Sequence, residues 1–197
     1  DWISNSKNVK DSFNVAGAED SRYCQDLPAG ATKDSYDYTL WGDKAEQIYE
    51  GVVVGYGARN IKFANECWPA IHDMDYCLHC SSSSDLFGCV GLRNKCYCIF
   101  NKQYSKEDYF ALREKIIRHM NEIPYTDKRG NVYRYGEFFP SEFSPFAYNE
   151  TIAQDFFPLT KDQVQARGFL WRDPEAQGYQ TTTNALDLPD RIGDVQD

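Results

Sequence analysis

The sequence contains no long apolar run and no excess of basic residues. No apolar segment approaches the roughly 18 residues that a membrane-spanning helix requires, so we expect no membrane span. The chain has 197 residues, with 21 Lys and Arg against 30 Asp and Glu, and a formal net charge of −9. A nucleic-acid groove needs clustered basic residues, so direct nucleic-acid binding is not expected. No signal peptide is recognised, and we expect a cytoplasmic protein.

Between residues 10 and 100 the sequence instead carries a repeat of aromatic residues. Every second aromatic residue recurs at a nearly constant distance, which is roughly 25 residues in both series and more regular in the first. A fixed period of roughly 20 to 50 residues is typical of stacked repeats. The two series are Phe13, Tyr38, Phe63 and Phe87, and Tyr23, Tyr49, Tyr76 and Tyr97.

The apolar segments within the repeat are short and rich in β-branched and aromatic residues, as in 48–54 and 96–100. Gly, Asp, Asn, Pro and Ser separate them, which indicates strands and turns rather than amphipathic helices. We therefore expect a mainly β fold. Residues 1–104 should form a parallel β-solenoid of about four coils of about 25 residues, with each aromatic series stacked as a ladder. The alternative is an ordinary antiparallel β domain whose spacing arises by chance.

The residue that follows each aromatic position is small in all but one case. Small side chains suit a narrow solenoid interior, although the pattern leaves open whether the aromatic rings themselves point in or out. On this register, Cys77 and Cys98 should lie in contact on adjacent coils, buried and reduced.

The cysteines are seven in number, and all but Cys24 fall between Cys67 and Cys98. Disulfide frameworks usually use an even number in small secreted domains, so we favour free thiols. Two close pairs, Cys77 with Cys80 and Cys96 with Cys98, could together bind zinc, with Cys89 as an alternate ligand. The competing interpretation, which we favour, is a ladder of buried thiols. We expect no cofactor, with zinc as the alternative and disulfides as a third interpretation.

After Phe100 the pattern changes to that of an amphipathic helix. Ser105 is a candidate N-cap before an acidic first turn, apolar residues then recur at helical spacing, and Pro124 ends the pattern. We expect this helix, over 105–121, to cap the open end of the solenoid, because terminal coils expose unpaired edges. A small hairpin should follow around 128–131.

Residues 136–160 are rich in aromatic residues but broken by prolines, which excludes a long helix. We expect an arm that docks on a solenoid face, in the same chain or in a neighbouring copy, because its rings need a rigid surface. Short helices are expected near 150–155 and after Thr160, where Gln163 completes a capping box. Cap and arm make a second domain, 105–172, and 173–197 form a polar linker or tail.

Four stretches of the sequence resemble a known family. They are FGCVGLRNK at 87–95, YCIFNKQYSK at 97–106, GEFFPSEFSPFAYNET at 136–151 and FPLT at 157–160. Over residues 10–197 the chain resembles the central portion of an uncharacterised family of cysteine-rich repeat proteins from ultrasmall candidate-phylum bacteria. The resemblance implies flanking zinc ribbons, and the family offers no activity that could be carried over to this chain. This chain often has Ser, Thr or Val where the family has Cys, which weakens the case for a metal cluster inside the coils.

Three functions from different classes fit these features. We favour a non-enzymatic structural or protein-interaction module, which presents a rigid surface and assembles with a protein partner or with copies of itself. The arm residues Phe138, Phe143 and Tyr148 are the expected partner-binding residues. The first alternative is a zinc-linked protein that associates with nucleic acids or imitates DNA. The second is a solenoid hydrolase, for which the sequence locates no catalytic residues.

Overall fold

The computed structural model describes residues 2–28 and 32–173. These residues are mainly β-structure, and the chain divides into two compact units, Asp1–Pro140 and a second unit that begins at Ser141. The strands are β1 (Ile3–Ser4), β2 (Phe13–Ala16), β3 (Gln25–Leu27), β4 (Tyr36–Gly42), β5 (Glu46–Gly55), β6 (Arg59–Cys67), β7 (His72–Asp75), β8 (Ser84–Phe87), β9 (Cys96–Ile99), β10 (Lys102–Gln103), β11 (Tyr125–Thr126) and β12 (Val132–Tyr133). The helices are α1 (Lys106–Glu122), α2 (Ala153–Phe156), α3 (Lys161–Ala166) and the 3-10 turns η1 (Ser141–Phe143) and η2 (Tyr148–Glu150).

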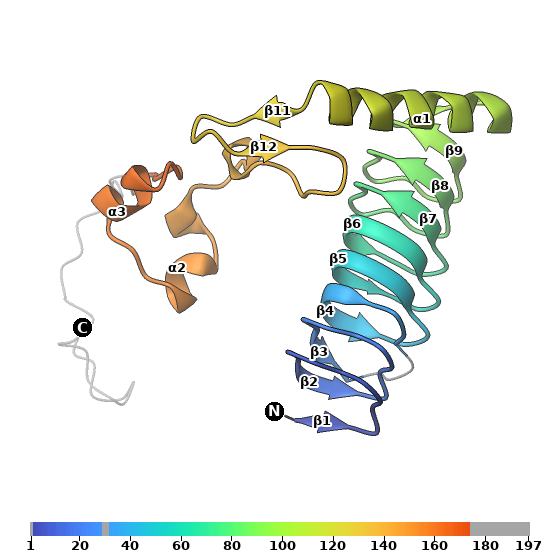
Figure 1. Ribbon diagram of the computed structural model, residues 1–197, viewed down its shortest axis with the longest axis horizontal. Coiled ribbons are helices and arrows are strands. Elements are labelled where there is room, and N and C mark those ends of the chain that lie inside the picture. Colours follow the sequence, from blue (N-terminus) through green and yellow to red (C-terminus); the bar gives the residue numbers. More distant parts are fainter. Residues whose placement is uncertain (1, 29–31, 174–197) are drawn as a thin grey trace, which may run out of the picture. The chain divides into compact units, whose positions relative to one another are not determined.

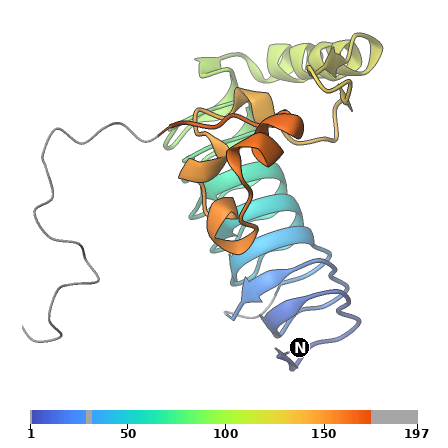
Figure 2. The same ribbon diagram turned by 90° about the vertical axis from the view of Figure 1, so that its left-hand side faces the viewer.

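The first unit contains a parallel β-solenoid, which confirms the predicted architecture (Figure 1). Strands β1 to β9 pair in sequence order, each parallel to the next, and β10 turns back antiparallel to β9. Ile3 pairs with Val15 on the next coil, and Gln25 pairs with Thr39. The distance in sequence between such partners is the length of one coil, which is therefore about half of the predicted length. The prediction of about four long coils is therefore wrong, and the solenoid makes about seven turns (Figure 2).

Each coil is built from three-residue steps. Every third residue has a left-handed backbone, which turns the chain, and the residue after it is directed into the core. In β6 the left-handed residues have φ of 50 to 53°, and the residues that follow them are fully buried. Four such steps make up one short coil around a narrow interior. The pairs in β6 are Asn60 and Ile61, Phe63 and Ala64, and Glu66 and Cys67.

The aromatic residues do not form the two predicted ladders. Phe63 stacks on Tyr76 of the next coil with ring centroids 4.5 Å apart, although the two were assigned to different series. Tyr38 is instead buried in the core, opposite Gly51 of the next coil, where a Cβ atom would lie 2.5 Å from Cγ2 of Ile48. The predicted ladders fail because the coil is short. The spacing within each aromatic series covers two turns of the solenoid, so each predicted ladder skips every second coil.

Serine and cysteine have the same role in the core. Ser35 donates a hydrogen bond to the carbonyl two residues earlier at 3.0 Å and accepts one from the Ile48 amide at 3.4 Å. Cys67 likewise donates to the carbonyl two residues earlier and accepts from the Cys80 amide, both at 3.4 Å. These side chains therefore supply partners for backbone groups at the sharp turns, where a buried group left unpaired would be destabilising.

Helix α1 begins as predicted, with the Ser105 hydroxyl accepting a hydrogen bond from the Asp108 amide at 3.1 Å. Its buried residue Tyr109 belongs to an apolar cluster with Ile99 of β9. The predicted hairpin follows as the antiparallel pair β11 and β12. Among the described residues, no helix is long and apolar enough to cross a membrane.

The second unit is small, and its described part is organised around Tyr148. The Tyr148 amide donates to the Leu170 carbonyl at 2.8 Å, and its hydroxyl donates to the Phe157 carbonyl at 2.7 Å. Helix α3 has the predicted capping box of Thr160 and Gln163. The boundary between the compact units follows residue 140, inside the predicted arm, rather than residue 104. Apart from its first residue, the tail predicted over 173–197 lies outside the described residues.

Candidate functional site

A polar cavity of about 330 Å³ lies between the solenoid and α1. Successive coils contribute acidic and amide side chains to it, because the register places Arg59, His72 and Ser84 opposite one another and the residue after each lines the cavity. Helix α1 contributes an arginine and two aromatic rings. The lining residues are Asn60, Asp73, Asp75, Asp85, Tyr109, Phe110 and Arg113.

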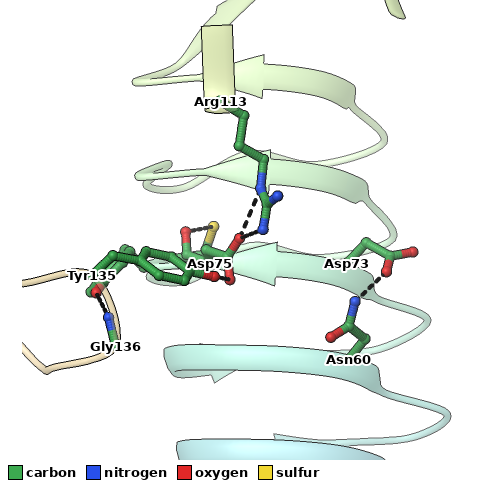
Figure 3. Close-up of polar contacts among 8 residues, drawn as sticks. Asn60, Asp73, Asp75, Arg113, Tyr135 and Gly136 are labelled. Carbon is green, nitrogen blue, oxygen red and sulfur yellow. Dashed lines mark hydrogen bonds and ion pairs between the residues drawn. The ribbon is translucent and has the colours of Figure 1, made fainter. Parts of the chain in front are cut away.

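Asp75 is a buried residue of this cavity, and it lies next to Arg113 and Tyr135 (Figure 3). Its Oδ2 accepts hydrogen bonds from Nε of Arg113 at 3.0 Å and from Nη2 of the same guanidinium. Its Oδ1 accepts from the Tyr135 hydroxyl at 3.1 Å. Burial, and secondarily the Asp75 charge, raise the pKa of Tyr135, which therefore stays a hydrogen-bond donor at neutral pH. Both oxygens of Asp75 are thus used to join three segments of the fold.

Asp73 lies one coil above Asn60 and is also engaged (Figure 3). Its carboxylate accepts from the Asn60 amide at 2.5 Å and contacts Nδ1 of His72 at 2.9 Å. Burial alone would raise the pKa of Asp73, but the hydrogen bonds from Asn60 and His72 outweigh it and lower the pKa. Asp73 is therefore ionised at neutral pH and unsuited to act as a general acid.

A second cavity, of about 450 Å³, is almost wholly apolar. It lies within the first unit, between the aromatic residues of the last coils, one face of α1 and the ring of Phe139. Apolar pockets of this size with a few polar groups at the edge are typical of small-molecule sites.

The four predicted zinc ligands are not assembled into a site. Cys77, Cys80 and Cys98 are buried, whereas Cys96 is partly exposed. In the part of the chain that the structure describes, no group of three or more Cys, His, Asp or Glu is arranged to bind a metal. Zinc binding by these four residues stays a prediction, while the burial of six of the seven cysteines agrees with the thiol-ladder interpretation.

The register of that ladder differs from the one predicted. Because Asp75 pairs with Phe87, the neighbour of Cys77 on the next coil is Cys89. Cys98 instead lies opposite Leu86. The predicted contact between Cys77 and Cys98 is therefore wrong, again because the coil is about half as long as predicted.

The three predicted partner-binding residues are divided between the two units. Phe138 belongs to the first unit, where its ring centroid lies 6.3 Å from that of Phe63. Phe143 and Tyr148 belong to the second, where Tyr148 packs against Phe169 at 5.6 Å and Phe143 is more than half exposed. Their binding of a partner stays a prediction.

The polar cavity was not predicted from the sequence. Asp73 and Asp85 are separated by one coil, but the longer predicted period would put them on different sides of the solenoid. The pairing of Asp75 with Arg113 spans 38 residues and has no local signal. No protein-family model, curated protein or solved structure matches this chain.

Proposed function

We propose that this chain is a non-enzymatic protein-interaction module that associates with a second copy of itself through residues 141–173. The main support for this proposal is the large exposed apolar surface of this small unit. Six of its large apolar side chains are between 56% and 73% exposed. They are Phe143, Phe146, Ile152, Phe156, Phe157 and Leu170.

The unit has little core of its own. Of its described hydrophobic residues, two are buried, Ala147 and Val164. Small units bury a smaller fraction of their surface on folding than large ones, so their stability is marginal and association can add to it. All seven cysteines of the chain precede residue 99, so none is available to this unit. Exposed apolar patches of this kind are typical of interaction surfaces, which supports association.

The charges of the unit favour a second copy as the partner. Lys161 pairs with Asp173 at 2.6 Å, and Arg172 pairs with Glu150 at 2.7 Å. These four charges are neutralised within the unit, so they add little repulsion between the apolar surfaces of two copies. Two-fold pairing of identical faces is the commonest arrangement of protein oligomers.

We also infer that α1 caps the β9 end of the solenoid. Strand β10 folds back on β9, and α1 lies across this end (Figure 1). A covered edge cannot accept a further strand. Growth by strand pairing at this end is therefore disfavoured.

For the hydrolase alternative, we consider the carboxylates of the polar cavity as the candidate catalytic groups. Asp73 and Asp75 accept hydrogen bonds there from Asn60, Arg113 and Tyr135, and the lowered pKa of Asp73 disfavours proton donation. A retaining or inverting glycosidase, for example, needs one carboxylic acid that can donate a proton. The engagement of Asp73 and Asp75, two of the three carboxylates that line the cavity, supports a non-enzymatic role.

The test is the molar mass of the full chain in solution, measured by light scattering across a range of concentrations. The wild type should be a dimer. The variant Phe146→Ser/Phe156→Ser/Phe157→Ser should be a monomer with an unchanged circular dichroism spectrum. Phe13→Ser is the matched control, because Phe13 is 51% exposed but lies in the solenoid. A wild-type monomer at every concentration, or a dimer that survives the triple substitution, would contradict the proposal.

A further inference from the structure

The apolar cavity has three walls. Tyr76, Phe87 and Phe100 come from successive coils, and neighbouring rings meet edge to face with centroids 5.8 and 6.3 Å apart. Helix α1 provides Ile116 and Met120 as the second wall, and Phe139 closes the third. All these residues belong to the first unit, so the cavity is formed within one compact part of the chain.

The shape of the cavity depends on Gly88. This residue has φ of +63°, a conformation that glycine adopts readily. A Cβ atom at this position would lie 2.6 Å from Cε1 of Phe100, which is too close for any side chain. The absence of a side chain therefore lets the Phe100 ring lie directly on the backbone of the preceding coil and form one wall.

The mouth of the cavity leaves apolar surface in contact with water. Phe100 is 66% exposed and Phe139 is 55% exposed, while Phe87 behind them is buried. A hydrocarbon guest would cover both exposed rings. Because burial of apolar surface is the main favourable term in such binding, the cavity favours an apolar chain over a polar molecule.

Two polar side chains at the edge of the cavity select the head group of the guest. Lys115 and His119 lie one helical turn apart on α1, and both line the cavity. In the described part of the chain neither side chain forms an ion pair or hydrogen bond, whereas Arg113 and Arg118 of the same helix are both paired. Lys115 supplies a positive charge and His119 a ring N–H donor, which together suit a carboxylate.

We propose that this cavity binds a free, straight-chain monocarboxylate, with the hydrocarbon chain between the aromatic wall and α1 and the carboxylate at Lys115 and His119. The hydrocarbon supplies most of the affinity, and each methylene removed from the chain should weaken binding about fourfold. The positive charge of Lys115 supplies the preference for an anionic head group. This site is independent of the proposed self-association, because it lies outside residues 141–173.

The test uses the full chain and the fluorescent probe dansyl-undecanoate, displaced below their micellar concentrations by two amphiphiles whose alkyl chains differ by one methylene, the cationic one having the longer chain. Dodecanoate should displace the probe with a stoichiometry of one per chain. Dodecyltrimethylammonium, with the opposite head-group charge, should bind about tenfold more weakly. Equal affinities for the two head groups, or no binding of dodecanoate, would overturn the proposal.

Substitutions at the cavity test the contact with the head group and the contact with the hydrocarbon chain separately. Lys115→Glu should weaken dodecanoate binding about tenfold and strengthen dodecyltrimethylammonium binding. Lys106→Glu is the matched control, because it makes the same charge change on α1 at a residue that does not line the cavity, and it should leave the ratio of the two affinities unchanged. Met120→Trp should fill the cavity and abolish binding of both amphiphiles. If Lys115→Glu and Lys106→Glu behave alike, or if Met120→Trp binds as well as the wild type while folded, the site is not the one proposed.

Discussion

Arg113 of α1 and Asp75 of β7 form a buried ion pair that joins the helix to the solenoid. The Arg113 Nε donates to Asp75 Oδ2 at 3.0 Å, and the Asp75 side chain is 5% exposed. The other oxygen of Asp75 accepts a hydrogen bond from Tyr135, which follows the β11 and β12 hairpin. One carboxylate therefore connects three segments that are distant in sequence, and its charge is tolerated because each oxygen has a donor.

Arg113→Met should lower the free energy of unfolding by about 3 kcal/mol. The substitution keeps the apolar stem but leaves the Asp75 carboxylate buried without its cation, and losing one partner of a buried pair typically costs about 3 to 5 kcal/mol. The lower end applies because 28% of the Arg113 side chain is exposed. Urea unfolding followed by circular dichroism measures the change.

Arg118→Met is the control for this substitution. Arg118 lies on the same helix and pairs with Glu114 at 3.0 Å, but both side chains are more than half exposed. A surface pair of this kind contributes about 0.5 kcal/mol or less. If the two variants lose similar stability, the pair of Arg113 with Asp75 does not hold the helix in the way described.

Cys67→Val should destabilise the solenoid more than Cys67→Ser. The Cys67 thiol accepts the hydrogen bond of the buried Cys80 amide, and valine would leave that amide unpaired at about 1 to 3 kcal/mol. Serine retains an acceptor and a donor, in the arrangement that Ser35 already has. Thermal and urea unfolding of the two variants compare them directly.

The matching control for the thiol prediction is Cys96, which is only partly buried. At Cys96 the valine and serine variants should be nearly equal in stability, because no backbone amide of the described residues depends on this thiol. A valine variant of Cys67 that is as stable as the serine variant would show that the amide finds another partner.

The parallel solenoid was predictable from the short β-rich segments and their turn residues, but the coil length was not read correctly. Adjacent coils can carry members of different series, as Phe63 and Tyr76 show, so the spacing within one series reports two turns. A better signal is the polar three-residue period at the start of the chain, formed by Asn5, Asn8, Asp11, Asn14 and Gly17. All five have positive φ, a conformation that Asn, Asp and Gly tolerate best.

The candidate sites were less accessible to sequence reasoning than the helix termini. The caps at Ser105 and Thr160 depend on residues three positions apart and were predicted correctly. The polar cavity instead depends on α1 packing across coils that lie 38 residues earlier in the chain. Likewise, the apolar cavity depends on the close approach of Phe100 to Gly88. Such contacts follow from tertiary packing, which no local pattern specifies.

Asp127 organises the turn between β11 and β12. Its Oδ1 accepts hydrogen bonds from the amides of Arg129 and Asn131, both at 2.9 Å. Its Oδ2 accepts from the Asn131 side chain at 2.9 Å and from the Tyr133 hydroxyl at 3.1 Å. Burial alone would raise the pKa of Asp127, but these hydrogen bonds, led by those of Asn131, lower it from 3.8 to about 2. A carboxylate that accepts several amide hydrogen bonds is stabilised in its ionised form.

The hairpin should therefore lose stability as the pH falls from about 4 to about 2. The pKa of Asp127 in the folded state, about 2, lies below its ordinary value of 3.8, so its contribution is complete above pH 4 and is lost as the carboxylate becomes protonated. The carbon resonance of the Asp127 carboxyl, followed by NMR, should titrate with a midpoint near pH 2, and exchange of the Arg129 and Asn131 amides should accelerate over the same range. Asp127→Asn should weaken the hairpin already at neutral pH, because its amide nitrogen cannot accept from Tyr133, and should remove this titration. A carboxyl midpoint near 3.8 would mean that the hydrogen bonds of the turn do not favour the ionised form.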